Sequence, residues 1–410
     1  FGRWASIHIK TRVGAQLATI LLGVLIFIDD YFNCLTVGSV MRPVTDEHKV
    51  SRAKLAYLID ATAAPVCIIA PISSWAAAVS GFVKGEDGLA LFVRAIPYNF
   101  YAILTIVMMV AMVLLKVEFG SMAKHEKNAM NGDLFSMGDR TQNIQEDEKG
   151  SEKGKVIDLI IPIVCLVICC VIGMVYTGGI FKGVDFVTAF SNSDASVGLA
   201  IGSFFGLVIT IILYMIRRVL PFKKCMDCLV DGFRAMVPAI LILTMAWTLK
   251  SMTDSLGAKE FVAASMKSVA GDFMSLLPAI IFLVACFLAF ATGTSWGTFG
   301  ILIPIVVAVF ENSNYELMII SISACMAGAV CGDHCSPISD TTIMASAGAE
   351  CDHVNHVSTQ LPYAMVAATV SFVAFFIAGF VRNAWIVMPL AIAMMIGVLV
   401  IIKFVLKSKE

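Results

Sequence analysis

The 410-residue sequence is 59% hydrophobic and only 14% charged, and its mean hydropathy is +0.88. These values exclude a soluble globular protein and indicate an all-α membrane protein that crosses the bilayer several times. The formal net charge of −1 gives no reason to expect a nucleic-acid partner. Most of the 12 cysteines lie in apolar runs, where a cysteine acts as a small hydrophobic residue rather than as half of a disulfide.

A basic segment opens the chain and an apolar run, Val13–Ile28, follows it. This run meets the polar stretch IDDYFN, and a shorter apolar run then leads to Arg42 and Lys49. Because Lys and Arg favour the cytoplasmic side of a membrane, both flanks should lie on that side. We therefore expect a re-entrant hairpin that enters and leaves by the same face. Its tip holds three polar residues, Asp29, Asp30 and Asn33.

A longer apolar run, Leu55–Val83, contains two prolines and one aspartate. As a single helix it would measure ~43 Å, more than the ~30 Å hydrocarbon core requires. Proline removes a helical hydrogen bond, and a charge at mid-bilayer costs at least ~3 kcal/mol. We therefore expect a span broken at Thr62–Pro71, next to Asp60. An external loop, Lys84–Arg94, and a returning span, Ala95–Leu115, should follow.

The charge distribution divides the chain into four segments. Residues 1–115 form a first repeat, and the polar segment 116–156 reads as a cytoplasmic, partly disordered linker. Residues 157–275 hold scaffold spans, and residues 276–410 form a second repeat that runs with the opposite orientation. Because scaffold spans precede only the second hairpin, and no signal peptide precedes Phe1, we expect about three further spans to be missing before that residue.

The second repeat has its own hairpin, interrupted by ATGTSWGT at Ala291–Thr298, which should open to the outside. Gly293 and Gly297 bracket this tip, and we expect the turn there to need positive φ or close backbone approach. The next span, Leu317–Ala347, contains the stretch CGDHCSPISDTT, whose acids, histidine and proline cannot face lipid. Tandem broken segments of this kind are typical of the binding site of a secondary transporter.

The polar interruptions supply carboxylate, hydroxyl and free carbonyl oxygens, which sodium and lithium prefer as ligands. In the first repeat the candidate ligands are Asp30, Asn33, Asp60, Thr62 and Ser73. In the second repeat they are Thr292, Thr294, Ser295, Asp333, Ser336, Ser339 and Asp340. Burial favours the protonated form of a carboxylate, so a proton and sodium compete for the same group. That competition is sufficient for exchange.

Several of these residues have a second interpretation. Either Asp29 or Asp30 can cap the N-terminus of a half-helix instead of binding an ion. Asp333 and Asp340 can cap one another or form a bridge to His334. Hydroxyl groups at helix breaks often satisfy the backbone, so each single Ser or Thr is a weaker candidate than an acid.

The histidines and cysteines of this region suggest no metal centre. Cys331, His334 and Cys335 would supply three ligands of a zinc site, but nothing nearby supplies the fourth at a recognised spacing. We therefore expect no transition metal and no other cofactor. His353 and His356 are expected to be solvated loop residues rather than a pH sensor.

Three motifs make the sequence similar to a known family. They are LIDATAAPVCIIAPISSW at residues 58–75, GTSWGTFGILIP at residues 293–304 and GDHCSPISDTT at residues 332–342, and they resemble the NhaC-type sodium/proton antiporters of the ion transporter superfamily. The resemblance implies two inverted repeats, each with a re-entrant hairpin and a discontinuous helix. It also implies a separate scaffold domain and a homodimer whose transport domain moves like an elevator. The unwound segments would lie at Asp60–Pro65 and Gly332–Pro337.

These observations predict a transporter rather than an enzyme. The expected activity is exchange of cytoplasmic Na+, and of Li+ with it, for external H+ across a bacterial plasma (inner) membrane. A Na+/H+-coupled exchanger of carboxylates such as malate and lactate is the alternative, although the broken segments contain no Lys or Arg to bind an anion. An intramembrane aspartyl hydrolase would need a paired dyad, whereas the acids here recur in repeats beside hydroxyls.

Overall fold

The computed structural model describes residues 9–71, 73–76, 79, 88–136, 154–155, 157–257, 274–310 and 314–407. Every regular element in these ranges is a helix. Among the described residues, six helices are long and apolar enough to cross a membrane, and the count rises to seven if the helices at Ala90–Tyr98 and Phe100–Leu115, bent by 49°, form one span. The chain is therefore a multi-pass helical membrane protein, as the composition predicts.

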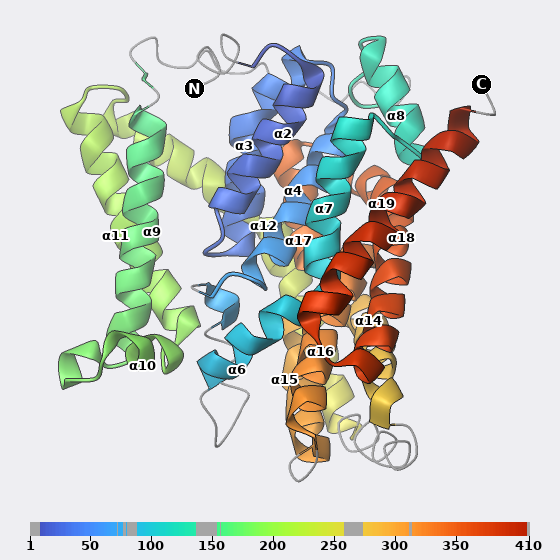
Figure 1. The fold of residues 1–410 in the computed structure, drawn as a ribbon. Helices are drawn as coiled ribbons and strands as arrows, with labels where there is room; N and C mark the ends of the chain where they lie inside the picture. Colours follow the sequence, from blue (N-terminus) through green and yellow to red (C-terminus); the bar gives the residue numbers. More distant parts are fainter. Residues whose placement is uncertain are drawn as a thin grey trace. The chain divides into compact units, whose positions relative to one another are not determined.

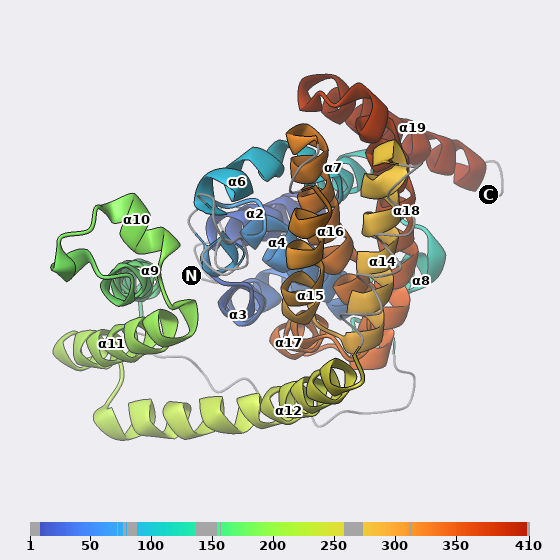
Figure 2. The same ribbon diagram turned by 90° about the horizontal axis from the view of Figure 1, so that it is seen from below.

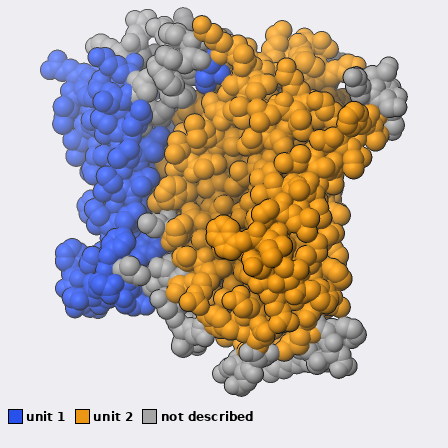
Figure 3. All heavy atoms as spheres, viewed as in Figure 1, with its two compact units in different colours: residues 1–9, 136–240 blue, residues 10–135, 241–410 orange. Residues whose placement is uncertain are grey.

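Two compact units make up the chain, and Figure 3 distinguishes them by colour. Unit 1 contains residues 1–9 and 136–240, and unit 2 contains residues 10–135 and 241–410. Residues 276–410 and nearly all of residues 1–115 thus belong to unit 2, which carries every candidate site residue.

Unit 1 is built around α9 (Ile157–Thr177) and α11 (Ala195–Ile216), with the short helices η2 (Ile180–Lys182) and α10 (Phe186–Ser191) between them. Glycines let the two long helices touch backbone to backbone: a Cβ atom on Gly202 would lie 2.5 Å from the Cα of Cys170. The next helix, α12 (Phe222–Ser255), is continuous over 34 residues. The basic residues Lys223, Lys224 and Arg234 lie on this helix.

The first hairpin of unit 2 consists of α2 (Arg12–Leu25) and α3 (Asp30–Glu47). Arg12 forms an ion pair with Glu126 on α8 (Gly120–Met130), and Lys49, just after α3, donates to the carbonyl of Met130 at 3.5 Å. The start of α2 and the end of α3 therefore lie at the same end of the unit, as a hairpin requires.

The next helix, α4 (Arg52–Cys67), differs from the sequence-based expectation. An unwound segment was expected at Asp60–Pro65, but α4 is helical through both residues and ends only at Cys67. Pro65 lies in the last turn, where it removes one hydrogen bond of a helix whose residues are all buried. Packing on every side holds the helix together past the proline, so the break begins at Ile68.

Two further differences concern the first repeat and the linker. The expected loop Lys84–Arg94 is outside the described residues up to position 87, and from Gly88 it is the helix α6 (Gly88–Ala95), which η1 (Ile96–Tyr98) links to α7 (Phe100–Leu115). The expected linker contains α8, and its residues 137–153 are outside the described part of the chain.

The second hairpin follows η3 (Met274–Leu276) and consists of α14 (Leu277–Thr292) and α15 (Ser295–Phe310). Gly293 has φ of +65°, and a Cβ atom there would lie 2.6 Å from the carbonyl oxygen of Ile338. The prediction that this position needs glycine is confirmed. Gly297 lies inside α15, where its backbone N–H bonds to Thr294 Oγ1 at 3.4 Å, so positive φ is not the reason for glycine at that position.

The second broken span consists of α16 (Tyr315–Cys335) and α17 (Asp340–Ala349). The break at Ser336–Ser339 coincides with Pro337, but the residues from Gly332 to Cys335 are helical, so the expected unwound segment was placed too early. A glycine at 332 is tolerated inside the helix because it lets α16 approach α14, where a Cβ atom would lie 2.1 Å from the carbonyl oxygen of Cys286.

The helix α18 (His353–Val381) runs the length of unit 2, and α19 (Ala384–Lys407) follows it. Near its start the carbonyl of Ser358 accepts from Ser121 of α8 at 2.9 Å. Near its end Gly379 lies against Ser275, just before α14. The two hairpins therefore begin at opposite ends of the unit, as Figure 1 shows, and Figure 2 shows α14 and α16 side by side.

Candidate functional site

Asp60 lies at the centre of a buried polar cluster in unit 2. Its Oδ2 atom is 2.7 Å from Gln360 Nε2, 3.1 Å from Thr342 Oγ1 and 3.2 Å from His356 Nε2. An ionised carboxylate can only accept hydrogen bonds, so all three neighbours donate. Oδ1, in contrast, has no hydrogen-bond partner among the described residues. Helices α4, α17 and α18 thus meet at one carboxylate oxygen.

His334 and Gln360 extend this cluster to α16. His334 Nε2 lies 3.1 Å from the backbone oxygen of Asp60, while Tyr101 Oη lies 3.2 Å from His334 Nδ1. The carbonyl requires a donor, so Nε2 carries the hydrogen and Nδ1 accepts from the tyrosine. Gln360 Nε2 also donates to the carbonyl oxygen of His334 at 2.8 Å. The expected alternative of a bridge to His334 therefore involves Asp60 rather than Asp333 or Asp340.

Asp333 joins the tip of the second hairpin to the second broken span. Ser295, the first residue of α15, donates to Asp333 Oδ2 at 3.0 Å. Asp333 is 1% exposed, and within the described ranges its Oδ1 atom has no hydrogen-bond partner. A buried carboxylate oxygen in this state can receive a cation or a proton.

Asp340 joins the second broken span to the first hairpin. Tyr31 on α3 donates to its Oδ2 atom, and the backbone N–H of Thr341 donates to its Oδ1 atom at 2.8 Å. Close packing supports this contact, because a Cβ atom on Gly38 of α3 would lie 2.4 Å from the carbonyl carbon of Gly348 on α17. The first half of the chain thus supplies a hydrogen-bond donor to an acid of the second half.

The adjacent acids Asp29 and Asp30 differ in their environment. Asp29 accepts from the backbone N–H of Phe32 at 3.0 Å and caps α3. Asp30 is fully buried, and none of the residues that the structure describes forms a hydrogen bond with either of its carboxylate oxygens. The indole N–H of Trp75 lies near the carboxylate but does not reach hydrogen-bond geometry. It also experiences the charges of Asp29 and Asp340. Of the two open interpretations, capping belongs to Asp29.

The predicted hydroxyl and amide ligands mainly bond to the backbone. Asn33 donates to the carbonyls of Gly23 and Ile26 at 2.7 and 2.8 Å, and thereby closes the end of α2. The other side chains bond to main-chain groups of their own or a neighbouring segment: Thr62 to Leu58, Ser73 to Cys67, Thr292 to Leu288, Thr294 to Gly297, Ser336 to Phe290 and Ser339 to Thr342. These contacts fit the second interpretation, in which such side chains satisfy backbone groups at helix breaks.

The acids form a connected carboxylate series rather than one coordination shell. Asp30 interacts electrostatically with Asp340, and Asp340, Asp333 and Asp60 interact with one another. Within the described ranges, no three His, Cys, Asp or Glu side chains come together as a group that could hold a metal ion. The carboxylates lie at or next to both hairpin tips and both broken helices.

Sequence reasoning missed five residues of this network: Tyr31, Tyr101, Thr342, His356 and Gln360. The expectation for His356 was wrong, because it is a fully buried residue of α18, not a solvated loop residue. His353 also belongs to α18, at its start, and its Nε2 lies 2.7 Å from the carbonyl oxygen of Pro337. The spacing of His356, Gln360 and Tyr363 places three polar side chains on one face of α18, which is the signal that would have found them.

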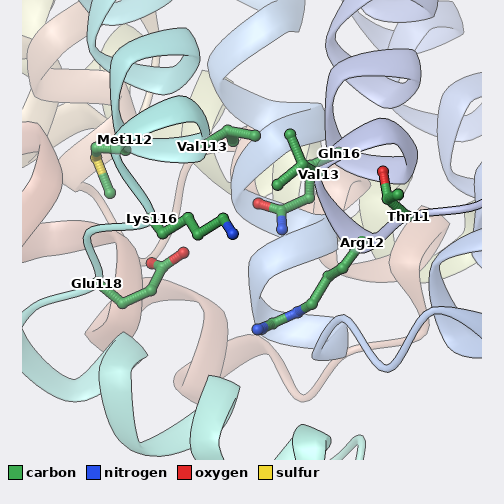
Figure 4. Close-up of a pocket in the computed structure, with 8 residues that line it drawn as sticks. All are labelled: Thr11, Arg12, Val13, Gln16, Met112, Val113, Lys116 and Glu118. Atoms are coloured by element: carbon green, nitrogen blue, oxygen red, sulfur yellow. The ribbon is translucent and has the colours of Figure 1, made fainter.

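A second polar cluster lies at the α8 end of unit 2. Lys54 is fully buried, its Nζ atom is 3.0 Å from Glu118 Oε2, and it lies over the ring of Tyr363 at 5.1 Å from the centroid. Beside it is a cavity of about 280 Å³, lined in part by Gln16 and Lys116 (Figure 4). None of the predicted site residues is among the described residues that line it, so the candidate site is the carboxylate series.

Most of the chain matches the model of a known protein family. A model of a family described as the Na+/H+ antiporter family matches residues 56–380 of this chain. The chain belongs to the Na+/H+ antiporter family. The matched region includes Asp60, both elements of the second hairpin and the whole second broken span. Members of this family are transporters, and the family supports Na+ and H+ as the transported ions.

Relatives of this antiporter family member carry different names. An uncharacterized protein of Haemophilus influenzae is 38% identical over 93% of this chain and 74% of its own length. A malate-2H(+)/Na(+)-lactate antiporter of Bacillus subtilis is 28% identical over 40% of this chain and 35% of its own length. An uncharacterized Na(+)/H(+) antiporter of H. influenzae is 31% identical over 35% of this chain and 31% of its own length.

Proposed function

We propose that this protein exchanges cytoplasmic Na+, and Li+ with it, for external H+ across a bacterial plasma membrane. The environment of the Asp30 carboxylate is the observation on which the proposal rests. A fully buried carboxylate without a hydrogen-bond partner in the described part of the chain is costly as a bare anion, so it requires a proton or a cation. Occupation by one and then the other, in opposite directions of transport, is exchange.

The proposed ion-binding groups are the carboxylates of Asp30, Asp60, Asp333 and Asp340. Ser295 and Tyr31 orient two of these acids. Asn33, Thr62, Thr292 and Ser336 would contribute at most through the backbone carbonyls that their side chains hold in place. Thr294 would contribute through its own carbonyl, which accepts from the Thr298 hydroxyl. Each acid gives sodium a hard oxygen ligand and gives a proton a titratable group.

The proposed architecture is a pair of inverted repeats whose hairpins enter the membrane from opposite faces. Hairpins that begin at opposite ends of unit 2 support it. Unit 1 would act as scaffold, and the protein would work as a homodimer with an elevator motion of the transport domain. The polar segment 116–156 would remain on the cytoplasmic side.

A carboxylate exchanger is a second candidate, because the Bacillus subtilis relative is named a malate-2H(+)/Na(+)-lactate antiporter. A carboxylate substrate would need free backbone N–H groups at the half-helix ends. At α3 the N–H of Phe32 is bonded to Asp29, and at α17 the N–H of Thr341 is bonded to Asp340. Since the protein's own carboxylates occupy these donors, the site favours a cation.

Transport by the purified protein in proteoliposomes tests the proposal. Sodium, lithium, potassium and malate are offered separately, and proton movement is recorded with a pH-sensitive dye. We expect sodium and lithium to drive proton movement in the opposite direction. Malate-driven movement without a sodium response would contradict the proposal and favour the carboxylate exchanger.

Asp30→Asn provides the matched variant, because the amide keeps the shape of the side chain and loses its charge. We expect sodium-dependent proton movement to fall more than tenfold, equivalent to ~1.4 kcal/mol. Asp227→Asn, which alters an exposed acid of α12, is the control and should exchange normally. Near-normal exchange by Asp30→Asn at normal expression would remove Asp30 from the mechanism.

A further inference from the structure

Gln360 occupies a position that the exchange chemistry above does not use. Its side chain is 1% exposed and lies on α18, outside both hairpins and both broken spans. One nitrogen atom, Nε2, makes two hydrogen bonds: one to Asp60 Oδ2 at 2.7 Å and one to the carbonyl oxygen of His334 at 2.8 Å. A single amide group therefore joins the acid of α4 to the backbone of α16.

These two hydrogen bonds explain why a glutamine suits position 360. A primary amide is a neutral group that places two hydrogens on one nitrogen, so it can satisfy a carboxylate and a carbonyl together. Lysine would also donate twice, but its charge would neutralise Asp60. Glutamate could not donate twice from one atom. Glutamine keeps the negative charge of Asp60 in place while it occupies one of the two carboxylate oxygens.

The donors around Asp60 are distributed unevenly. Gln360, His356 and Thr342 all lie within 3.2 Å of Oδ2, whereas Oδ1 has His334 Nε2 at 3.7 Å and no hydrogen-bond partner in the described part of the chain. Of the three donors, Gln360 is nearest. Its second bond to α16 also prevents the amide from turning away, so it determines which carboxylate oxygen is left open.

We propose that Gln360 is a positioning residue of the exchange site: it holds Oδ2 of Asp60 so that Oδ1 faces the transported monovalent cation. This inference rests on the proposed function and extends it to α18. It assigns to that helix a part in cation affinity in addition to packing. The residue itself does not need to touch the ion.

The test compares variants of Gln360 in proteoliposomes with sodium titrations of exchange. Gln360→Met keeps the length of the side chain and removes both donors. We expect the sodium concentration at half-maximal rate to rise about tenfold, with a smaller change in the maximal rate. A purely structural role would instead lower the amount of active protein and leave that concentration unchanged.

Two further variants keep the test decisive if Gln360→Met does not reach the membrane. Gln360→Asn keeps both donors but is one methylene shorter, so it should weaken sodium affinity to an intermediate degree. Gln360→Lys keeps both hydrogen bonds and adds a positive charge, so it should fold and lose sodium exchange. Sodium exchange with normal affinity in Gln360→Lys would overturn the inference.

Ser371→Ala is the control, because Ser371 is a fully buried polar residue of the same helix and bonds only to the carbonyl of Ala367 among the hydrogen bonds that the structure describes. It should titrate as the wild type does.

Sodium-dependent thermal stabilisation, measured against choline, supplies a readout besides transport and should be reduced in Gln360→Met. Absence of sodium exchange in the wild type would refute the proposed function, whereas normal wild-type exchange with an unchanged Gln360→Met titration would refute this inference alone.

Discussion

Four buried aspartates of similar sequence context have different surroundings in the folded protein. Asp60 receives three donors on one oxygen, Asp340 receives one on each oxygen, Asp333 receives one, and Asp30 receives none from the described residues. An acid surrounded by donors is stabilised as an anion, whereas an acid without donors needs a proton or a cation. We therefore expect the four acids to take different parts in exchange, and Asp30 to depend most on a bound proton or cation.

Ser295→Ala tests this division at a single residue. The change removes the donor of the hydrogen bond to Asp333 Oδ2 and leaves the nearby Ser339 hydroxyl and every carboxylate in place. A lost hydrogen bond to a charged group costs about 1.5–3 kcal/mol, so we expect apparent sodium affinity to fall at least tenfold. Thr45→Val is the control, because the buried Thr45 hydroxyl bonds to the carbonyl of Met41 in its own helix, α3, at 3.1 Å. Equal sodium titrations for Ser295→Ala and wild type would show that Asp333 does not depend on this donor.

The hairpin tips and helix breaks position these acids. Sequence patterns predicted the second hairpin turn at Gly293 and the break at Pro337, because glycine and proline act directly on the local backbone. They placed the first break too early, since the packing that keeps α4 helical past Pro65 comes from distant segments. Gln360 and His356 escaped prediction for the same reason: their partner lies about 300 residues earlier, and only the fold brings them together.

Gly293→Ala tests the tip of the second hairpin as an element. The new methyl group would require a left-handed conformation and would lie 2.6 Å from the carbonyl oxygen of Ile338, a backbone atom that cannot move independently. We expect a loss of exchange of at least tenfold, since a shift of this tip displaces Ser295 from Asp333. Gly397→Ala on α19, where a Cβ atom would meet nothing within 4 Å, should be neutral. Full activity in Gly293→Ala would mean that the tip does not position the acid.

At the scale of the molecule, the orientation in the membrane follows from the ends of unit 2. The α8 end gathers Arg12, Arg52 and Lys54 with their acidic partners, and the other end carries the connection between α18 and α19. Lys and Arg favour the cytoplasm during insertion. The α8 end should therefore face the cytoplasm.

Cysteine labelling checks this orientation. Lys10→Cys and Lys49→Cys, both exposed at the α8 end, should react with an impermeant reagent only from the cytoplasmic side. Asn383→Cys, exposed between α18 and α19, should react only from the outside. The background lacks reactive native thiols such as Cys228. Labelling of positions 10 and 49 from opposite faces would contradict the first hairpin.

The buried ion pair between Lys54 and Glu118 has a consequence for biosynthesis. Glu118 lies 64 residues later in the chain, so the ribosome completes α4 well before the partner of its lysine exists. During that interval Lys54 is an unpaired ammonium group, which should resist entry into the bilayer and hold the start of α4 on the expected cytoplasmic side. Once α7 and the following segment emerge, Glu118 neutralises the lysine. The charge that orients the nascent chain is therefore no longer accessible in the mature protein.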